Sequence, residues 1–342
     1  MTTITPRERV WKAIRHQQPD YTPYQIGLTK QAAERLTAHT GDPHYIEKIG
    51  NHLTSCYYEG YCRETTPGSG IFRDHFGVTW NRNGVDKDIG VLDGLVLPEP
   101  TLAGYTFPKF DTAALRAQMQ KTIDGANGRF TVAGIGFSMF ERAWTFRGME
   151  NILIDMMTEP EFVHDLLDAI CEHNLKYIRA ALEFPFDMVQ FGDDWGQQKG
   201  LIMGPAHWRT FIKPRMQRMF AEVKRAGKAV GLHSCGDIHE LFPDLIEMGL
   251  DVYQTFQPEI YDLPAVKKEF GNHLTFWGGI STQRALPWKT PEEIRQIARE
   301  TIAIMGVNGG YIAAPTHAVP GDVPPENIIA LAEVFQEQLS PD

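Results

Sequence analysis

The chain has 342 residues, of which 42% are hydrophobic, 22% charged and 11% aromatic. This composition is typical of a globular protein with a sizeable core and excludes collagen-like, coiled-coil and disordered chains. Its 33 Lys and Arg against 43 Asp and Glu give a net charge of −10, which argues against nucleic-acid binding and against docking on anionic membranes.

The N-terminal region has no apolar segment typical of a secretory signal, and no window is long and apolar enough to span a bilayer. We therefore expect a cytoplasmic protein. The four cysteines are too few for a disulfide framework, so we expect free thiols at Cys56, Cys62, Cys171 and Cys235.

In chain order, a helix over residues 6–16 is predicted first, and residues 24–27 can start a strand. From about residue 111, short apolar runs alternate with helical patterns. The expected strands are 130–134, 187–191, 229–233, 251–254, 274–278 and 310–314. The expected helices are 112–125, 148–157, 160–183, 205–226, 238–248, 291–305 and 325–339, with a further connecting segment at 262–270.

This alternation is typical of parallel strands joined by crossover helices. Six strands after residue 125 and one near residue 25 favour a single-domain (β/α)8 TIM barrel over residues 1–342. An open sheet is disfavoured because Gly134-Ile135-Gly136 lacks the third glycine of a dinucleotide-binding turn. Residues 40–110, rich in Gly, Pro and aromatics, are interpreted as an elaboration on the barrel.

Functional residues of such a barrel gather where its strands end. The polar residues that follow the predicted strands are Glu141, Arg142, Asp193, Asp194, His233, Cys235, Gln254, Ser281 and His317.

The sharpest pattern among them is His233-Ser234-Cys235. Side chains two residues apart on a strand share a face, so the imidazole and the thiol would enter the barrel mouth together. Both groups are good zinc ligands, and His317 is our choice for the third. Two plainer interpretations stay open: Cys235 and His233 can be core residues, and Asp193-Asp194 can be a solvated loop or a helix N-cap.

At these residues the sequence resembles the uroporphyrinogen decarboxylase superfamily, within it the cobalamin-dependent methyltransferase branch (methylcorrinoid:coenzyme M methyltransferase-like). The resemblance covers nearly the whole chain and rests on PRERVWKAIRHQQPDYTP, FERAWTFRGMENIL, VQFGDDWGQQKGLIMGPAHWRTFIKP, GLHSCGDIHELFPDLIEMGLDVYQ, WGGISTQ and VPPENI. It implies a (β/α)8 barrel.

The chain departs from the family pattern in two places. The decarboxylase carries an arginine-rich segment that binds substrate carboxylates, but residues 24–29 here contain no arginine. The methyltransferase branch binds zinc with His-x-Cys and a later Cys, and that third position falls on His317 here. A His-Cys-His site has one thiolate fewer and therefore about one more unit of positive charge.

The resemblance implies a zinc-dependent methyltransferase that moves a methyl group between a corrinoid (cobalamin) on a separate protein and a small-molecule thiol, folate, amine or ether. His233, Cys235 and His317 would hold the zinc. Asp193, Asp194 or Glu141 would supply a displaceable fourth ligand or accept a proton. The alternatives are a metal-free decarboxylase acting on a porphyrinogen, a zinc hydrolase, and a non-catalytic module that binds a corrinoid protein.

Overall fold

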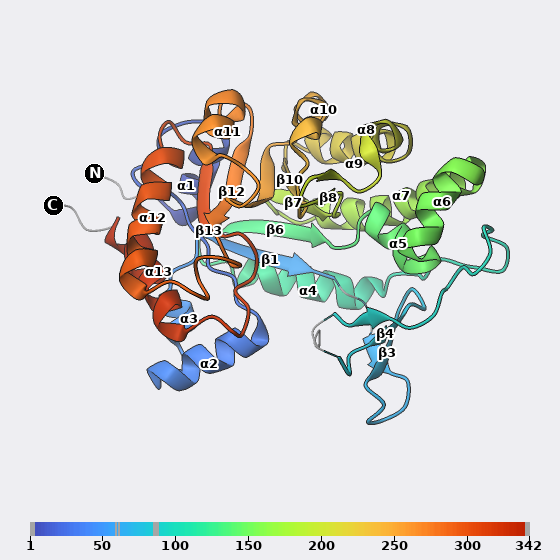
Figure 1. Ribbon diagram of the computed structural model, residues 1–342, viewed down its shortest axis with the longest axis horizontal. Coiled ribbons are helices and arrows are strands. Elements are labelled where there is room, and N and C mark those ends of the chain that lie inside the picture. Colours follow the sequence, from blue (N-terminus) through green and yellow to red (C-terminus); the bar gives the residue numbers. More distant parts are fainter. Residues whose placement is uncertain (1–3, 59, 61, 85–88, 339–342) are drawn as a thin grey trace.

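The computed structural model describes residues 4–58, 60, 62–84 and 89–338. Its centre is a curled parallel sheet of seven strands (Figure 1). In spatial order these are β1 (Leu53–Tyr57), β6 (Phe130–Ile135), β7 (Met188–Gly192), β10 (Ala229–His233), β11 (Val252–Phe256), β12 (Thr275–Ile280) and β13 (Tyr311–Pro315). The predicted α/β class and the parallel order are confirmed, and all six strands expected after residue 125 are present.

Helices connect and cover these strands (Figure 1). They are α1 (Pro6–Ile14), α2 (Lys30–Thr40), α3 (Tyr45–Lys48), α4 (Thr112–Asp124), α5 (Phe140–Arg147), α6 (Met149–Thr158), α7 (Pro160–Leu182), α8 (Gly204–His207), α9 (Lys213–Arg225), α10 (Phe242–Met248), α11 (Leu263–Phe270), α12 (Pro291–Met305) and α13 (Pro325–Glu337). A π-helical turn, Trp208–Ile212, precedes α9, and a 3₁₀ turn, His239–Leu241, precedes α10. In the described part of the chain, no helix is both long and apolar enough to cross a membrane.

Local sequence signals start several of these helices. Thr5 and Glu8 form a capping box before α1, and Thr290 and Glu293 form one before α12. In both helices proline occupies the first turn, where its missing N–H costs nothing. The strands are apolar on both faces because helices cover one face and an inner cluster fills the other.

The inner cluster explains the curl of the sheet. In this cluster, buried side chains from all seven strands contact Val10 and Ile14 of α1. The strand residues are Leu53, Phe130, Val132, Met188, Ala229, Val252, Trp277, Ile312 and Ala314. A flat sheet could not bring its two edge strands into one cluster. Helix α1 therefore lies against the N-terminal end of a TIM-barrel-like sheet, and the opposite, C-terminal end carries the candidate site.

Residues 24–27, expected to start a strand, form an extended segment with only isolated bridges to its neighbours. Its backbone bonds β13 through Gln25 N to Ala313 O (2.9 Å), and its Tyr24 O accepts from His52 N (3.0 Å) beside β1. It thus contacts both edges of the curled sheet without being a regular strand, and the full eight-stranded barrel stays a prediction.

The interpretation of residues 40–110 needs a correction. Leu53–Tyr57 of this region is β1, an edge strand of the main sheet, rather than part of an elaboration. The strand was missed because the aromatic and glycine-rich sequence around it masks its short apolar pattern. The rest of the region includes a separate antiparallel sheet that projects beyond α4 (Figure 1): β2 (Cys62–Glu64), β3 (Ile71–Asp74), β4 (Thr79–Asn81) and β5 (Val91–Leu92).

Candidate metal centre

Strand β10 presents the first two residues of the site. His233 ends the strand, paired with Gly192 of β7 and Gln254 of β11. Cys235 follows two residues later, as the strand alternation predicts. The chain then turns at Gly236, which has φ +79° and passes so close to Gly196 that a Cβ would lie 2.2 Å from its carbonyl carbon. Only glycine fits there, because both the φ angle and the contact exclude a side chain.

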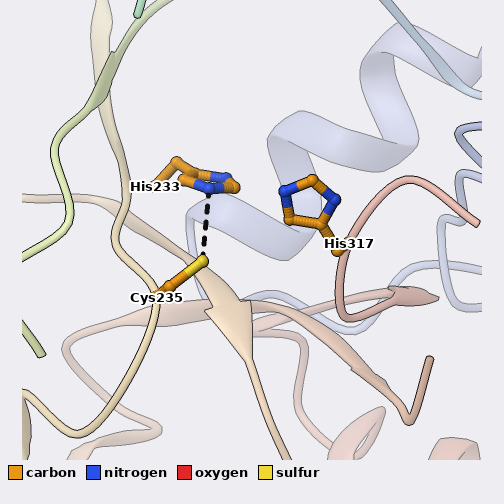
Figure 2. A group of neighbouring side chains, drawn as sticks. All are labelled: His233, Cys235 and His317. Atoms are coloured by element: carbon orange, nitrogen blue, oxygen red, sulfur yellow. Dashed lines mark hydrogen bonds between the residues drawn. The ribbon is translucent and has the colours of Figure 1, made fainter. Parts of the chain in front are cut away.

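The third residue, His317, comes from the loop after β13. Figure 2 shows its ring converging on His233 and Cys235. One ligand atom from each residue lies within 4.8 Å of the other two. The Cys235 Sγ is 3.7 Å from His233 Nε2, and tetrahedral zinc would separate such a sulfur and nitrogen by about 3.6 Å. The three predicted ligands are therefore brought together, with a donor set and spacing that fit zinc.

A chain of hydrogen bonds orients the His233 ring. Tyr57 Oη donates to Gln190 Oε1 (2.6 Å), and Gln190 Nε2 donates to Gln254 Oε1 (2.7 Å). The same Gln254 oxygen lies 3.0 Å from His233 Nδ1. Because an amide oxygen only accepts, Nδ1 carries the proton and Nε2 presents its lone pair toward Cys235. This is the arrangement that supports a metal-binding histidine.

Sequence reasoning missed this supporting chain. Gln190 and Gln254 sit within apolar strands, and a buried amide in such a strand needs a polar partner, which was the available signal. Tyr57 reaches Gln190 because its ring crosses Gly134, where a Cβ would lie 2.1 Å from the ring. Glycine at 134 therefore serves the contact between Tyr57 and Gln190, not a dinucleotide.

Asp194 lies beside the three ligands. Its Oδ1 accepts from the Cys235 N–H (2.8 Å) and is 4.0 Å from His233 Nε2. Burial, and then the negative charge of Asp194, raise the pKa of the Cys235 thiol well above its usual value. Without a cation the thiol is therefore protonated, and a bound divalent metal is what would favour its thiolate.

The neighbouring carboxylates have different surroundings. Asp193 is fully buried, and its oxygens accept from the N–H groups of Met139, Phe140 and Glu141 at the start of α5. It therefore holds the helix that carries Glu141. Burial raises the pKa of Asp193 to about 6. Burial and the charges of Asp194 and Asp193 raise the pKa of Glu141 well above its usual value, so the surroundings of this carboxyl favour its protonated form.

A cavity of 520 Å³ adjoins the site. Cys235 and His317 line it, together with hydroxyl and amide side chains such as Thr255, Thr316 and Gln257. No lysine or arginine is among the described residues that line it. The substrate carboxylates of a porphyrinogen would find no cation in this cavity. Among the described residues no two cysteines are joined by a disulfide, and Cys56 and Cys171 are buried.

These observations define the class of protein. It has a curled α/β fold with a candidate His-Cys-His metal centre where its parallel strands end. Within it, the model of the uroporphyrinogen decarboxylase (URO-D) family matches residues 108–338. This match covers more than half of the chain, and the chain belongs to that family.

Individual relatives are more distant. The chain is 26% identical over 199 residues to a uroporphyrinogen decarboxylase of Magnetococcus marinus, covering 57% of this chain and 52% of the relative. It is 28% identical over 194 residues to one of Bacillus cereus, covering 56% and 52%. The chain thus spans about half the length of the curated relatives it matches. Among solved structures, a methyltransferase from Methanosarcina mazei aligns with a TM-score of 0.75 and 17% identity, over 99% of this chain and 100% of that one. At that identity the match shows a shared fold.

Proposed function

We propose that this protein is a zinc-dependent methyltransferase that moves a methyl group between a corrinoid on a separate protein and a small-molecule substrate. The observation that carries the proposal is the convergence of His233, Cys235 and His317, with the His233 tautomer set by Gln254. Three protein ligands leave one coordination position for substrate, as in catalytic zinc sites.

Zinc bound there would act as a Lewis acid that lowers the pKa of a substrate thiol or hydroxyl, or polarises a methyl ether. The chain's own residues then manage the proton and the geometry. Asp194, next to His233 Nε2, is our candidate for a displaceable fourth ligand and for the proton acceptor. Glu141, whose pKa is raised by burial and by the neighbouring carboxylates, is the candidate proton donor for the reverse direction. Asp193 positions Glu141.

In the transfer, the substrate lone pair forms the new bond to the methyl carbon as the cobalt–carbon bond breaks. Both electrons of that bond stay on cobalt, and the substrate proton passes to a carboxylate. The corrinoid is supplied by the partner protein, because no part of the fold described here is a corrinoid-binding domain that we recognise.

The metal centre is tested by zinc stoichiometry after identical dialysis. We expect about one zinc per chain in the wild type, and most of it lost in Cys235→Ser and His317→Ala, since two protein ligands hold zinc weakly. His317→Cys restores a thiolate at the third position and should retain zinc. His239→Ala, an exposed histidine elsewhere, is the matched control. Full zinc in His317→Ala would exclude His317 as a ligand.

Methyl transfer is tested with methylcobalamin, free or on a corrinoid partner, and a panel of thiols, folates, amines and ethers. Transfer to or from the substrate changes the absorbance of the corrinoid. A metal-free chain that decarboxylates a porphyrinogen would support the alternative function, and a zinc protein that hydrolyses substrate without corrinoid would support a hydrolase.

A further inference from the structure

A second cavity, of 320 Å³, lies between the antiparallel sheet and the C-terminal ends of β1 and β6. Its walls are largely aromatic and include Tyr57, Phe76, Trp80, Phe110, Phe137 and Tyr177. This volume is at the lower end of the range for small-molecule sites, and flat aromatic walls favour a planar ring. The metal centre and the neighbouring 520 Å³ cavity use other residues.

Arg142 brings a buried cation to this cavity. Its side chain is 10% exposed, and its guanidinium lies over the Phe76 ring, 3.9 Å from the centroid. The nearest oxygens to its Nη1 are Thr145 Oγ1 at 3.5 Å and Asp74 Oδ2 at 3.6 Å. Most of its five N–H donors therefore have no acceptor among the described residues, although a buried cation normally needs one.

Asp74 forms an ion pair with Arg142, with its Oδ2 3.6 Å from Nη1, and its carboxylate also has partners in its own turn. It accepts from the backbone N–H groups of Phe76 (2.9 Å) and Val78 (3.0 Å), and from Trp80 Nε1 (3.2 Å). Asp74 thus shapes the turn between β3 and β4. The Nε and Nη2 donors of Arg142, which bond no described residue, are available for an acceptor from outside the chain.

His173 is the second polar group without a partner. It is 4% exposed, and neither ring nitrogen has a hydrogen-bond partner in the part of the chain that the structure describes. Its ring stacks on Phe110, with centroids 4.5 Å apart. Burial lowers the pKa of His173 to about 3, so the ring is neutral and offers one donor and one acceptor. His173 lines the cavity, and a small shift of its buried ring would let its N–H donate to a ligand hydroxyl or ether oxygen, or its other nitrogen accept from a hydroxyl.

The charge of the lining points to an anion. Arg142 and Arg82 outnumber the single described carboxylate, Asp74. A carboxylate matches the planar guanidinium of Arg142 in geometry as well as in charge. The described lining of the metal-side cavity, by contrast, holds no lysine or arginine.

We propose that this cavity binds an aromatic carboxylate, with the carboxylate on Arg142, the ring between the aromatic walls, and a hydroxyl or ether substituent on His173. Tyr57, one wall of the cavity, begins the chain of hydrogen bonds through Gln190 and Gln254 to His233. The described lining of this cavity includes none of the three metal ligands, so on the proposed function the compound binds beside the substrate of the metal centre, not in its place. Binding itself does not depend on that function.

The test is direct binding of 4-methoxybenzoate to the full-length protein by calorimetry, with 4-methoxybenzylamine and cyclohexanecarboxylate as comparison probes. We expect 4-methoxybenzoate to bind at least ten times more tightly than either, since one probe reverses the charge and the other removes the aromatic ring. Arg142→Gln should weaken binding at least tenfold, and Arg142→Lys less. Arg116→Gln, an exposed arginine outside the cavity, should bind as the wild type does.

His173→Phe keeps an aromatic ring and tests the polar contact if Arg142 variants do not fold. In the wild type, 4-hydroxybenzoate should bind more tightly than benzoate, and this preference should disappear in His173→Phe. Equal binding of the amine and the carboxylate, or unchanged binding by a folded Arg142→Gln, would overturn the proposal. Zinc content and methyl transfer are measured separately, so the failure of either would count against the proposed function alone.

Discussion

Gln254→Leu is the sharpest test of how the metal centre is organised. The amide oxygen of Gln254 accepts from both His233 Nδ1 and Gln190 Nε2. Leucine has a similar volume but no acceptor, so the His233 ring can then take the tautomer with a proton on Nε2. That tautomer cannot bind a metal through the nitrogen facing Cys235.

Loss of such a supporting partner weakens metal binding about 10- to 100-fold, equivalent to about 1.4 to 2.7 kcal/mol. Competition with a chromophoric zinc chelator at neutral pH measures this change. Gln254→Glu keeps an acceptor oxygen and should hold zinc well. Gln296→Leu makes the same change on the exposed face of α12 and should leave zinc affinity unaltered. If Gln254→Leu folds and binds zinc as tightly as the wild type, the assigned tautomer is wrong.

Two predictions concern stability. Burial and then the charge of Arg9 lower the pKa of His52 from 6.5 to about 4, so the unfolded chain binds more protons between these values and stability falls as pH drops from 6.5 to 4. The free energy of unfolding should fall by about 3 kcal/mol over this range. In His52→Gln this pH-dependent loss should be absent when urea unfolding is measured at the same pH values. The same pH profile in the variant and the wild type would contradict the assignment. Gly134→Ala places a methyl group against the Tyr57 ring and should lower the free energy of unfolding by about 1 to 3 kcal/mol. Wild-type stability of this variant in the same urea assay would show that the ring moves freely.

The order of elements could be read from the sequence because it depends on local patterns. Apolar runs bounded by turn residues predicted the strands after residue 125, and the predicted helices 6–16 and 291–305 correspond to α1 and α12, which the structure starts with capping boxes. The two-residue spacing of His233 and Cys235 predicted their common face, since strand side chains alternate regardless of the rest of the fold.

Tertiary structure alone decided which distant residues meet. His317 reaches His233 only because β13 and β10 belong to the same curled sheet. The chain from Tyr57 through Gln190 and Gln254 joins three strands, so no local pattern specifies it. Likewise, the sequence placed Arg142 after a strand, but only the packing of the antiparallel sheet over α5 buries its side chain beside Phe76 and Asp74.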